Sequence, residues 1–292
     1  MTISVGTESV DLGFVQLGWF KVIFLGIVQG ITELLPISST AHLRIVPSLL
    51  GWQDPGGSAF SAAMQLASLA AVLTYFWQDI KSLSRGTFRA IATQNYKSKS
   101  FQITLGLLIG TIPIAIAGLL LKKTLNVPNS PLRSLVVVGA ASILMSLLLA
   151  LAEIKGKRQR TFEQRTLQDG FWVGVAQAFA LIPGVSRSGS TLTPGLFLGL
   201  DRATAARFSF LLGLPAVVLA GALEIHTLLK AGLDLNGWGI LLAGLASASV
   251  SAFAAIYGLL HYLEKQSTWI FVWYRLAMGL FLIVGSTQGF LH

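Results

Sequence analysis

The sequence contains no cysteine and few charged residues. Of its 292 residues only 11% are charged, whereas a soluble domain usually has about 25%. The absence of cysteine excludes disulfides and thiol chemistry. The scarcity of charge argues against an ordinary soluble domain, and 53% hydrophobic residues with a mean hydropathy of +0.71 indicate an integral membrane protein.

Long apolar runs recur along the chain, and each is about as long as a segment that crosses a hydrocarbon core. They cover residues 61–77, 101–121, 134–152, 208–229, 238–260 and 269–284. Lipid forces backbone groups to pair within such a segment, and the runs lack the apolar–polar alternation of β-barrel strands. The sequence therefore predicts an all-α polytopic integral membrane protein.

The second half of the chain resembles the first when the sequence is shifted by 148 residues. Gln29 then falls on Gln177 and Ser38 on Ser186, and "VQGITELLPISST" aligns with "AQAFALIPGVSRSGST". Chance similarity between apolar stretches is the alternative, but several agreements at one shift favour duplication. We predict a single membrane domain, residues 1–292, with repeat one at about 14–152 and repeat two at about 169–290; such repeats often surround a midplane site.

Each repeat is predicted to begin with a re-entrant helical hairpin. Residues 171–182 form a helix of about 18 Å, too short for a hydrocarbon core about 30 Å thick. This predicts a hairpin over residues 171–200, and the repeat predicts its partner over 19–50, although 14–35 alone is long enough for one span. Each half then adds three transmembrane helices. Because three is odd, the two repeats are inverted, and their hairpins meet near the middle.

The net charge of +9 raises the question of nucleic acid binding, but the basic residues lie mainly in loops between the apolar runs. Positive charge on the cytoplasmic side explains them, so we expect no nucleic acid partner. One side of the bundle receives Lys81, Arg85, Arg89, Lys97, Lys99, Lys155, Lys157, Arg158, Arg160, Arg165, Arg202, Arg207 and Lys265. The other receives Lys122, Lys123, Arg133 and Lys230. The first side should be cytoplasmic, with both termini and the first hairpin facing the exterior.

Polar residues gather in the first predicted turn, where such groups are costly at membrane depth and usually functional. Gln29 and Glu33 are four residues apart and share one helix face. Ser38 or Ser39 can cap the following helix. Ser39 and His42, three residues apart, again share a face, so this turn brings a carboxylate, a hydroxyl and an imidazole together.

The second predicted turn, "PGVSRSGST", places Arg187 among hydroxyl groups. These belong to Ser186, Ser188, Ser190 and Thr191, while Gly184 and Gly189 allow close backbone approach. Hydroxyls, free N–H groups at a helix N-terminus and one guanidinium describe an anion site suited to phosphate. With the halves apposed, Arg187 can also pair with Glu33.

Structural readings stay open for these residues. A serine in a membrane helix usually bonds its own helix, Glu33 with Arg187 could be only an ion pair, and His42 could be an interfacial histidine. Four polar residues outside the turns also have structural readings, as packing amides or interfacial charges: Gln65, Gln177, Glu224 and Arg275.

At these turns the sequence resembles the undecaprenyl-pyrophosphate phosphatases of the bacitracin-resistance type. "QGITELLPISSTAH" and "PGVSRSGST" look like that family's two signatures, and the likeness continues through "RFSFLLGLPAV" and "FVWYRLAMGLFLIV". The resemblance implies a membrane phosphatase that hydrolyses undecaprenyl pyrophosphate to undecaprenyl phosphate and inorganic phosphate, recycling the lipid carrier of bacterial cell-wall synthesis. It also implies a divalent cation, Mg²⁺ or Ca²⁺, and an active site facing the periplasm or exterior of the inner (plasma) membrane.

The resemblance suggests roles for the residues of both turns. Arg187 and the N–H groups of residues 184–191 would hold the pyrophosphate, Ser39 would attack phosphorus, and His42 would take its proton or activate water. Glu33, with Gln29, would orient these groups or bind the metal. The residues expected to contact substrate are Gln29, Ser38, Thr40, Gly184, Ser186, Ser188 and Thr191.

Three points remain open at this stage. The nucleophile could be Ser39, His42 or a water molecule. Family members often have Glu where this chain has Gln29, so here Glu33 must carry the carboxylate role. A secondary transporter or flippase for a phosphorylated lipid or anion would use a similar fold, although passive anion binding disfavours a carboxylate such as Glu33. The expected partners are a prenyl pyrophosphate and membrane lipids, and a homodimer is left open.

Overall fold

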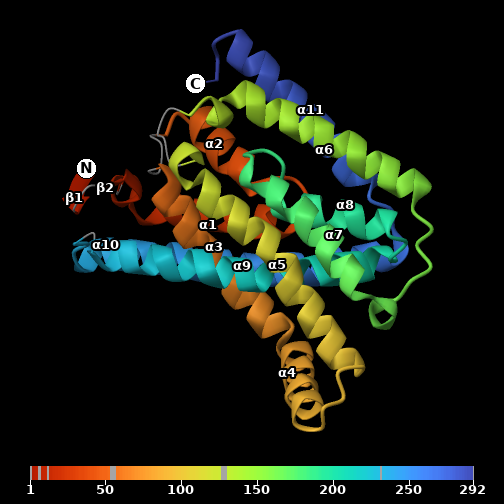
Figure 1. Ribbon diagram of the computed structural model, residues 1–292. Helices are drawn as coiled ribbons and strands as arrows, with labels where there is room; N and C mark the ends of the chain where they lie inside the picture. The colour runs from red at the N-terminus through yellow and green to blue at the C-terminus, as the bar shows by residue number, and fades with distance from the viewer. Residues whose placement is uncertain are drawn as a thin grey trace.

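The computed structural model describes residues 2–5, 8–11, 13–52, 57–125, 130–230 and 232–291, and the side chains of most of them. Eleven α-helices follow one another in this part of the chain (Figure 1): α1 Gly13–Leu34, α2 Ser39–Leu49, α3 Gly57–Tyr75, α4 Trp77–Ala92, α5 Lys99–Leu125, α6 Leu135–Lys155, α7 Leu167–Ala178, α8 Arg187–Phe197, α9 Arg202–Lys230, α10 Leu235–Lys265 and α11 Trp269–Thr287. Short 3₁₀ turns, η1 Pro131–Arg133, η2 Phe162–Gln164 and η3 Phe179–Leu181, lie between some of them.

Six helices in the described part of the chain are long and apolar enough to cross a membrane: α1, α5, α6, α9, α10 and α11. The apolar part of α3, residues 63–75, is shorter. The prediction of an all-α polytopic membrane protein is thereby confirmed. Helix α4 carries Lys81, Arg85 and Arg89 and projects from the bundle beside the start of α5 (Figure 1).

A short β-hairpin precedes the helices and was not predicted. Strands β1 (Thr2–Val5) and β2 (Glu8–Asp11) pair antiparallel, with Thr2 opposite Asp11. Their sequences, TISV and ESVD, carry β-branched residues that favour extended backbone. The runs are too short to have stood out beside the long apolar segments.

Two helices that each end at a turn inside the bundle form the centre of the molecule. In the first, Gly18 (φ 75°, ψ 175°) interrupts α1, so its continuous part is residues 19–34, about 24 Å long. The second, α7, begins at Leu167 rather than at the predicted residue 171, because Thr166 and Asp169 cap each other's backbone N–H groups. Ser38 and Ser186 both have φ 70°, and each precedes a helix of 11 residues, α2 or α8.

The hairpins pack against helices of the opposite half of the chain. Helix α1 lies along α10 and α7 along α5, while α6 pairs with α11 (Figure 1). Glycines bring these backbones together: a Cβ added to Gly30 would lie 2.2 Å from the Ala248 oxygen, and one on Gly174 2.2 Å from the Gly110 oxygen. This reciprocal packing fits two interleaved repeats; their inverted insertion in the membrane stays a prediction.

Candidate active site

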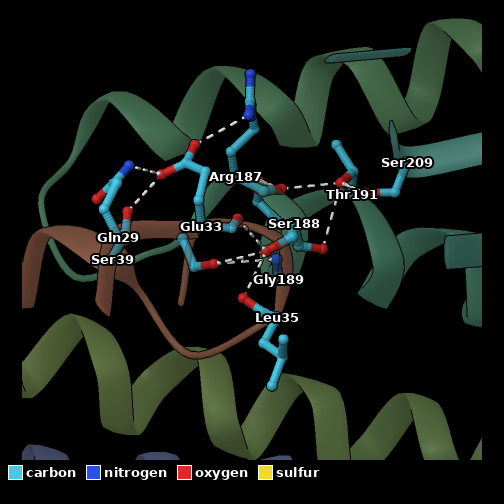
Figure 2. Close-up of polar contacts among 11 residues, drawn as sticks. Gln29, Glu33, Leu35, Ser39, Arg187, Ser188, Gly189, Thr191 and Ser209 are labelled. Atoms are coloured by element: carbon cyan, nitrogen blue, oxygen red, sulfur yellow. Dashed lines mark hydrogen bonds and ion pairs between the residues drawn. The ribbon is translucent and has the colours of Figure 1, made fainter. Parts of the chain in front are cut away.

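The two hairpin turns meet at an ion pair between the halves of the chain. Arg187 Nη2, at the start of α8, lies 2.9 Å from Glu33 Oε1, near the end of α1 (Figure 2). Ser188 Oγ donates to the Leu35 oxygen over 2.8 Å, so a hydroxyl of one turn satisfies a carbonyl at the end of the other helix. The pairing of Glu33 with Arg187 expected from the sequence is confirmed.

The Glu33 carboxylate receives hydrogen bonds from three side chains. Besides Arg187 at Oε1, its Oε2 accepts from Gln29 Nε2 at 3.0 Å and from Ser39 Oγ at 2.5 Å (Figure 2). Only 8% of Glu33 is exposed and 1% of Gln29. The short hydroxyl bond to a carboxylate is a charge-assisted one. Glu33 is therefore the group placed to take a proton from Ser39.

His42 is held by groups other than Ser39. Its Nδ1 lies 2.8 Å from the Ser38 oxygen and its Nε2 2.5 Å from Tyr274 Oη, and the His42 and Tyr274 rings stack at 5.6 Å with an interplanar angle of 4°. Among the described residues no hydrogen bond joins Ser39 to His42, and the Ser39 hydroxyl donates to Glu33 instead; proton transfer from Ser39 to His42 stays a prediction. Tyr274 was not predicted as a site residue, although it lies in the segment "FVWYRLAMGLFLIV".

Arg275 connects the two turns by hydrogen bonds to both of them. This residue of α11 is 1% exposed. Its Nη1 donates to the Pro36 oxygen at 2.8 Å, and its Nη2 donates to Gly184 and Val185 at 2.9 and 3.0 Å. A weaker bond of 3.4 Å runs from Nε to Ser142. The structural reading of Arg275 is confirmed. Within the described ranges its guanidinium donates only to neutral carbonyl oxygens, so it also brings a buried positive charge next to the site.

The hydroxyl groups of the second turn serve mainly to build it. Ser186 caps α8 by accepting from the Gly189 N–H, and Thr191 Oγ1 bonds the Arg187 oxygen at 2.8 Å and the Ser209 hydroxyl (Figure 2). Ser209 was not predicted. Of these hydroxyl groups, the one of Ser186 caps the helix. One of the first N–H groups of α8, that of Gly189, therefore has a partner before any anion binds.

The first turn departs from the prediction at Ser38. Ser38 occupies the N-cap position of α2, but its side chain makes no cap hydrogen bond, so the expected cap is wrong. Thr40 is exposed. The first N–H groups of α2 receive no side-chain cap, and such groups attract anions.

A small cavity lies beside the ion pair, between α1, α3, α8 and α9. It is lined by Glu33, Val72, Arg187, Ser209 and Gly213, among others. A Cβ on Gly213 would lie 3.4 Å from Arg187 Nη1, so the lack of a side chain there leaves room for the guanidinium. Arg187 is balanced by Glu33, whereas Arg275 pairs with no carboxylate in the part of the chain that the structure describes. The net positive charge favours an anion.

Among the described residues, no three His, Cys, Asp or Glu side chains gather into a metal site. A partial donor set is present: Gln29 Oε1 is buried and has no hydrogen-bond partner in that part of the chain, and it lies on the residue that bonds Glu33. Mg²⁺ is commonly bound by one or two carboxylates together with substrate phosphates. These residues fit a cation only if the substrate supplies further oxygen ligands.

Comparison with known proteins gives a consistent result over nearly the whole chain. The family described as "Bacitracin resistance protein BacA" matches residues 22–281. "Undecaprenyl-diphosphatase 2" of Mesorhizobium japonicum is 57% identical over 264 residues, 90% of this chain and 100% of that protein. "Undecaprenyl-diphosphatase" of Trichormus variabilis is 52% identical over 290 residues, covering 99% of this chain and 90% of that protein. The protein of the same name from Gloeobacter violaceus is 53% identical over 268 residues, 92% of each chain.

Replacing Arg275 should destabilise the protein strongly. The substitution Arg275→Leu removes the donor to three turn carbonyls, and each buried polar group left unpaired costs about 1–3 kcal/mol. The free energy of unfolding should therefore fall by more than about 3 kcal/mol. The exposed Arg89→Leu, in α4, should change it by less than about 0.5 kcal/mol. Thermal unfolding in detergent compares the two; equal shifts would contradict the role given to Arg275.

Proposed function

The chain belongs to the bacitracin resistance protein BacA family, and we propose that its two apposed turns hydrolyse undecaprenyl pyrophosphate. The products are undecaprenyl phosphate and inorganic phosphate, and the enzyme is a membrane phosphatase that returns the lipid carrier to cell-wall synthesis. The single observation that carries the mechanism is the Glu33 carboxylate, bonded at once to the Ser39 hydroxyl and to the Arg187 guanidinium.

Binding begins with the charge on Arg187. The guanidinium lies beside a cavity and is 19% exposed, with its partner Glu33 on one edge. A pyrophosphate that enters takes bidentate hydrogen bonds from it, and the positive charge of Arg275 acts on the same region. These fixed charges offset the negative charge that develops on the transferred phosphoryl group.

Cleavage then follows from the Ser39–Glu33 contact. The Ser39 oxygen attacks the terminal phosphorus while its proton passes to Glu33 Oε2. The bond from that phosphorus to the bridging oxygen breaks, and undecaprenyl phosphate leaves with the bridging oxygen. Water hydrolyses the phosphoserine in a second step and releases inorganic phosphate. His42, fixed by Ser38 and Tyr274, is placed near this turn to orient or activate that water.

A divalent cation is part of the proposal. Gln29 Oε1 and the Glu33 carboxylate would hold Mg²⁺ or Ca²⁺ together with phosphate oxygens. When bound, the cation supplies positive charge that offsets the charge on the phosphates. The amide of Gln29 coordinates but cannot act as a base, so the carboxylate chemistry rests on Glu33.

The proposed location is the bacterial inner (plasma) membrane, with the site facing the periplasm or exterior. Support comes from the loops, because the basic residues concentrate at the end of the bundle that carries α4 and the loop between α6 and α7. Such loops are cytoplasmic. The first hairpin then enters from the opposite face.

Ser39 should be essential and should carry the phosphoryl group. Ser39→Ala and Glu33→Gln should each lower phosphate release from a C55 or C15 prenyl pyrophosphate by at least about 10²-fold. Ser48→Ala, on the same helix α2, should leave the rate unchanged. A single-turnover reaction stopped by acid should yield a phosphorylated peptide that contains Ser39.

The adduct distinguishes the open alternatives. A phosphorylated His42 would identify that residue as the nucleophile. Rapid turnover without any phosphorylated residue would favour direct attack by water. If no phosphate is released in the presence of Mg²⁺ or Ca²⁺, the hydrolase proposal is wrong and anion transport becomes the better reading.

Removing divalent cations should abolish phosphate release, and Mg²⁺ or Ca²⁺ should restore it. Gln29→Leu should raise the cation concentration needed for half-maximal rate several-fold, because it removes an oxygen ligand. Gln29→Glu should lower it. The matched control is Gln177→Leu in the second hairpin. Gln177 is a buried amide that is not part of the proposed cation site, so this change should leave the cation requirement unchanged. Full activity in a chelator would contradict the metal assignment.

The absence of native cysteine allows a direct test of orientation. Asn95→Cys lies in the basic end and Gln288→Cys follows α11 at the other end, and both positions are exposed. A membrane-impermeant maleimide should label the second in intact cells and the first only after the membrane is opened. The reverse pattern would overturn the proposed orientation.

A further inference from the structure

A second group of arginine side chains lies at the basic end of the bundle, away from the paired turns. Arg165 sits between η2 and α7 and is only 7% exposed. Its Nε donates to the Phe162 oxygen at 2.6 Å. Its Nη1 and Nη2 are buried and have no hydrogen-bond partner among the described residues. A buried guanidinium without an acceptor is costly.

Aromatic rings and a second arginine surround this group. The Arg165 Cζ lies 3.0 Å from the centre of the Phe162 ring and 4.8 Å from that of Phe208. Arg207 Cζ lies 4.4 Å from the same Phe162 ring. Arg207 Nε is also buried without a partner in the described part of the chain, while its Nη2 pairs with Asp79 Oδ1. We call Arg165, Arg207, Phe162 and Phe208 the Arg165 cluster.

The carboxylates of this end of the bundle have other partners. Asp169 accepts from Arg160 at 2.9 and 2.5 Å, and Glu153 accepts from Arg158 and Arg202. Burial, and secondly the neighbouring Arg207, lower the pKa of Arg165 to about 9. The Arg165 guanidinium therefore remains charged at neutral pH, but among the described residues no carboxylate forms a hydrogen bond with it.

We propose that the Arg165 cluster is a second anion site, which binds a phosphate group. Its donors are Nη1 and Nη2 of Arg165, which form a planar fork suited to two phosphate oxygens, and Nε of Arg207. Two guanidinium groups against the single carboxylate of Asp79 leave a net positive charge. Arg207 gives the approach from solvent, since 38% of its side chain is exposed. Binding requires Arg165 to turn its fork toward the exposed side of Arg207.

The phosphate could come from an anionic lipid headgroup or from free inorganic phosphate. Both carry the same oxygens, and the cluster lies at the end of the bundle where basic residues meet headgroups. The site is separate from Glu33 and Arg187, so the proposal does not depend on the phosphatase reaction.

The test uses the full chain with Arg187→Gln, so that phosphate binding at the paired turns does not contribute. One arm adds inorganic phosphate in detergent, with sodium chloride as the ionic-strength control. The other compares phosphatidylcholine nanodiscs with and without phosphatidic acid. At about 100 times the dissociation constant, the thermal midpoint should rise by about 5 °C. A rise with phosphate alone identifies the free ion, and a rise with phosphatidic acid alone identifies the lipid.

Adding Arg165→Met should remove that rise, whereas adding Arg89→Gln at the same end should preserve it. Without any phosphate the Arg165→Met variant should be as stable as its parent or more stable, because it removes unpaired buried donors. Should Arg165→Met not fold, Arg165→Lys keeps the charge but not the fork, and it should bind at least about tenfold more weakly. No rise with either probe, a rise that survives Arg165→Met, or an equal loss of stability with and without phosphate would each overturn the proposal.

Discussion

The guanidinium group of Arg275 holds together a structure whose centre would otherwise consist of two broken helix ends. Where α1 and the α7–η3 segment stop, carbonyl groups lose their helical partners, and hydrocarbon cannot replace them. Arg275 donates to Pro36 in one turn and to Gly184 and Val185 in the other. A single buried side chain therefore sets the distance between the hairpins, and with it the distance between Glu33 and Arg187.

The same arrangement explains how one carboxylate can serve two purposes. Without substrate, Glu33 pairs with Arg187, so neither charge is buried alone, and it also accepts a hydrogen bond from the Ser39 hydroxyl. In the proposed mechanism, phosphate oxygens that engage Arg187 would remove a competing partner from the carboxylate and make it a better proton acceptor for Ser39. Substrate binding and activation of the proposed nucleophile would then be coupled through one side chain.

Much of this could be predicted from the sequence, because the physical signals are local. Proline and glycine mark the helix breaks, apolar length marks the spans, and the spacing of Gln29 and Glu33 places them on one face. The pairing of Glu33 with Arg187 followed from the match between the halves. The partner of Ser39 could not be predicted this way, because its hydrogen bond to Glu33 spans the turn between α1 and α2, and helix periodicity does not describe a turn. The contacts of Tyr274 and Arg275 depend on how α11 packs more than 230 residues along the chain from the first turn.

The reciprocal packing of hairpins on distant helices also bears on how the chain is made. Helix α5, on which α7 packs, has already been synthesised when α7 appears. In contrast, α1 packs on α10, which is translated roughly 200 residues later. During synthesis the first hairpin emerges before the surface of α10 on which its Gly26 and Gly30 pack. The order of translation thus makes the two halves unequal: the first hairpin cannot pack on α10 until that helix has been inserted, whereas α5 is already present when the second hairpin appears.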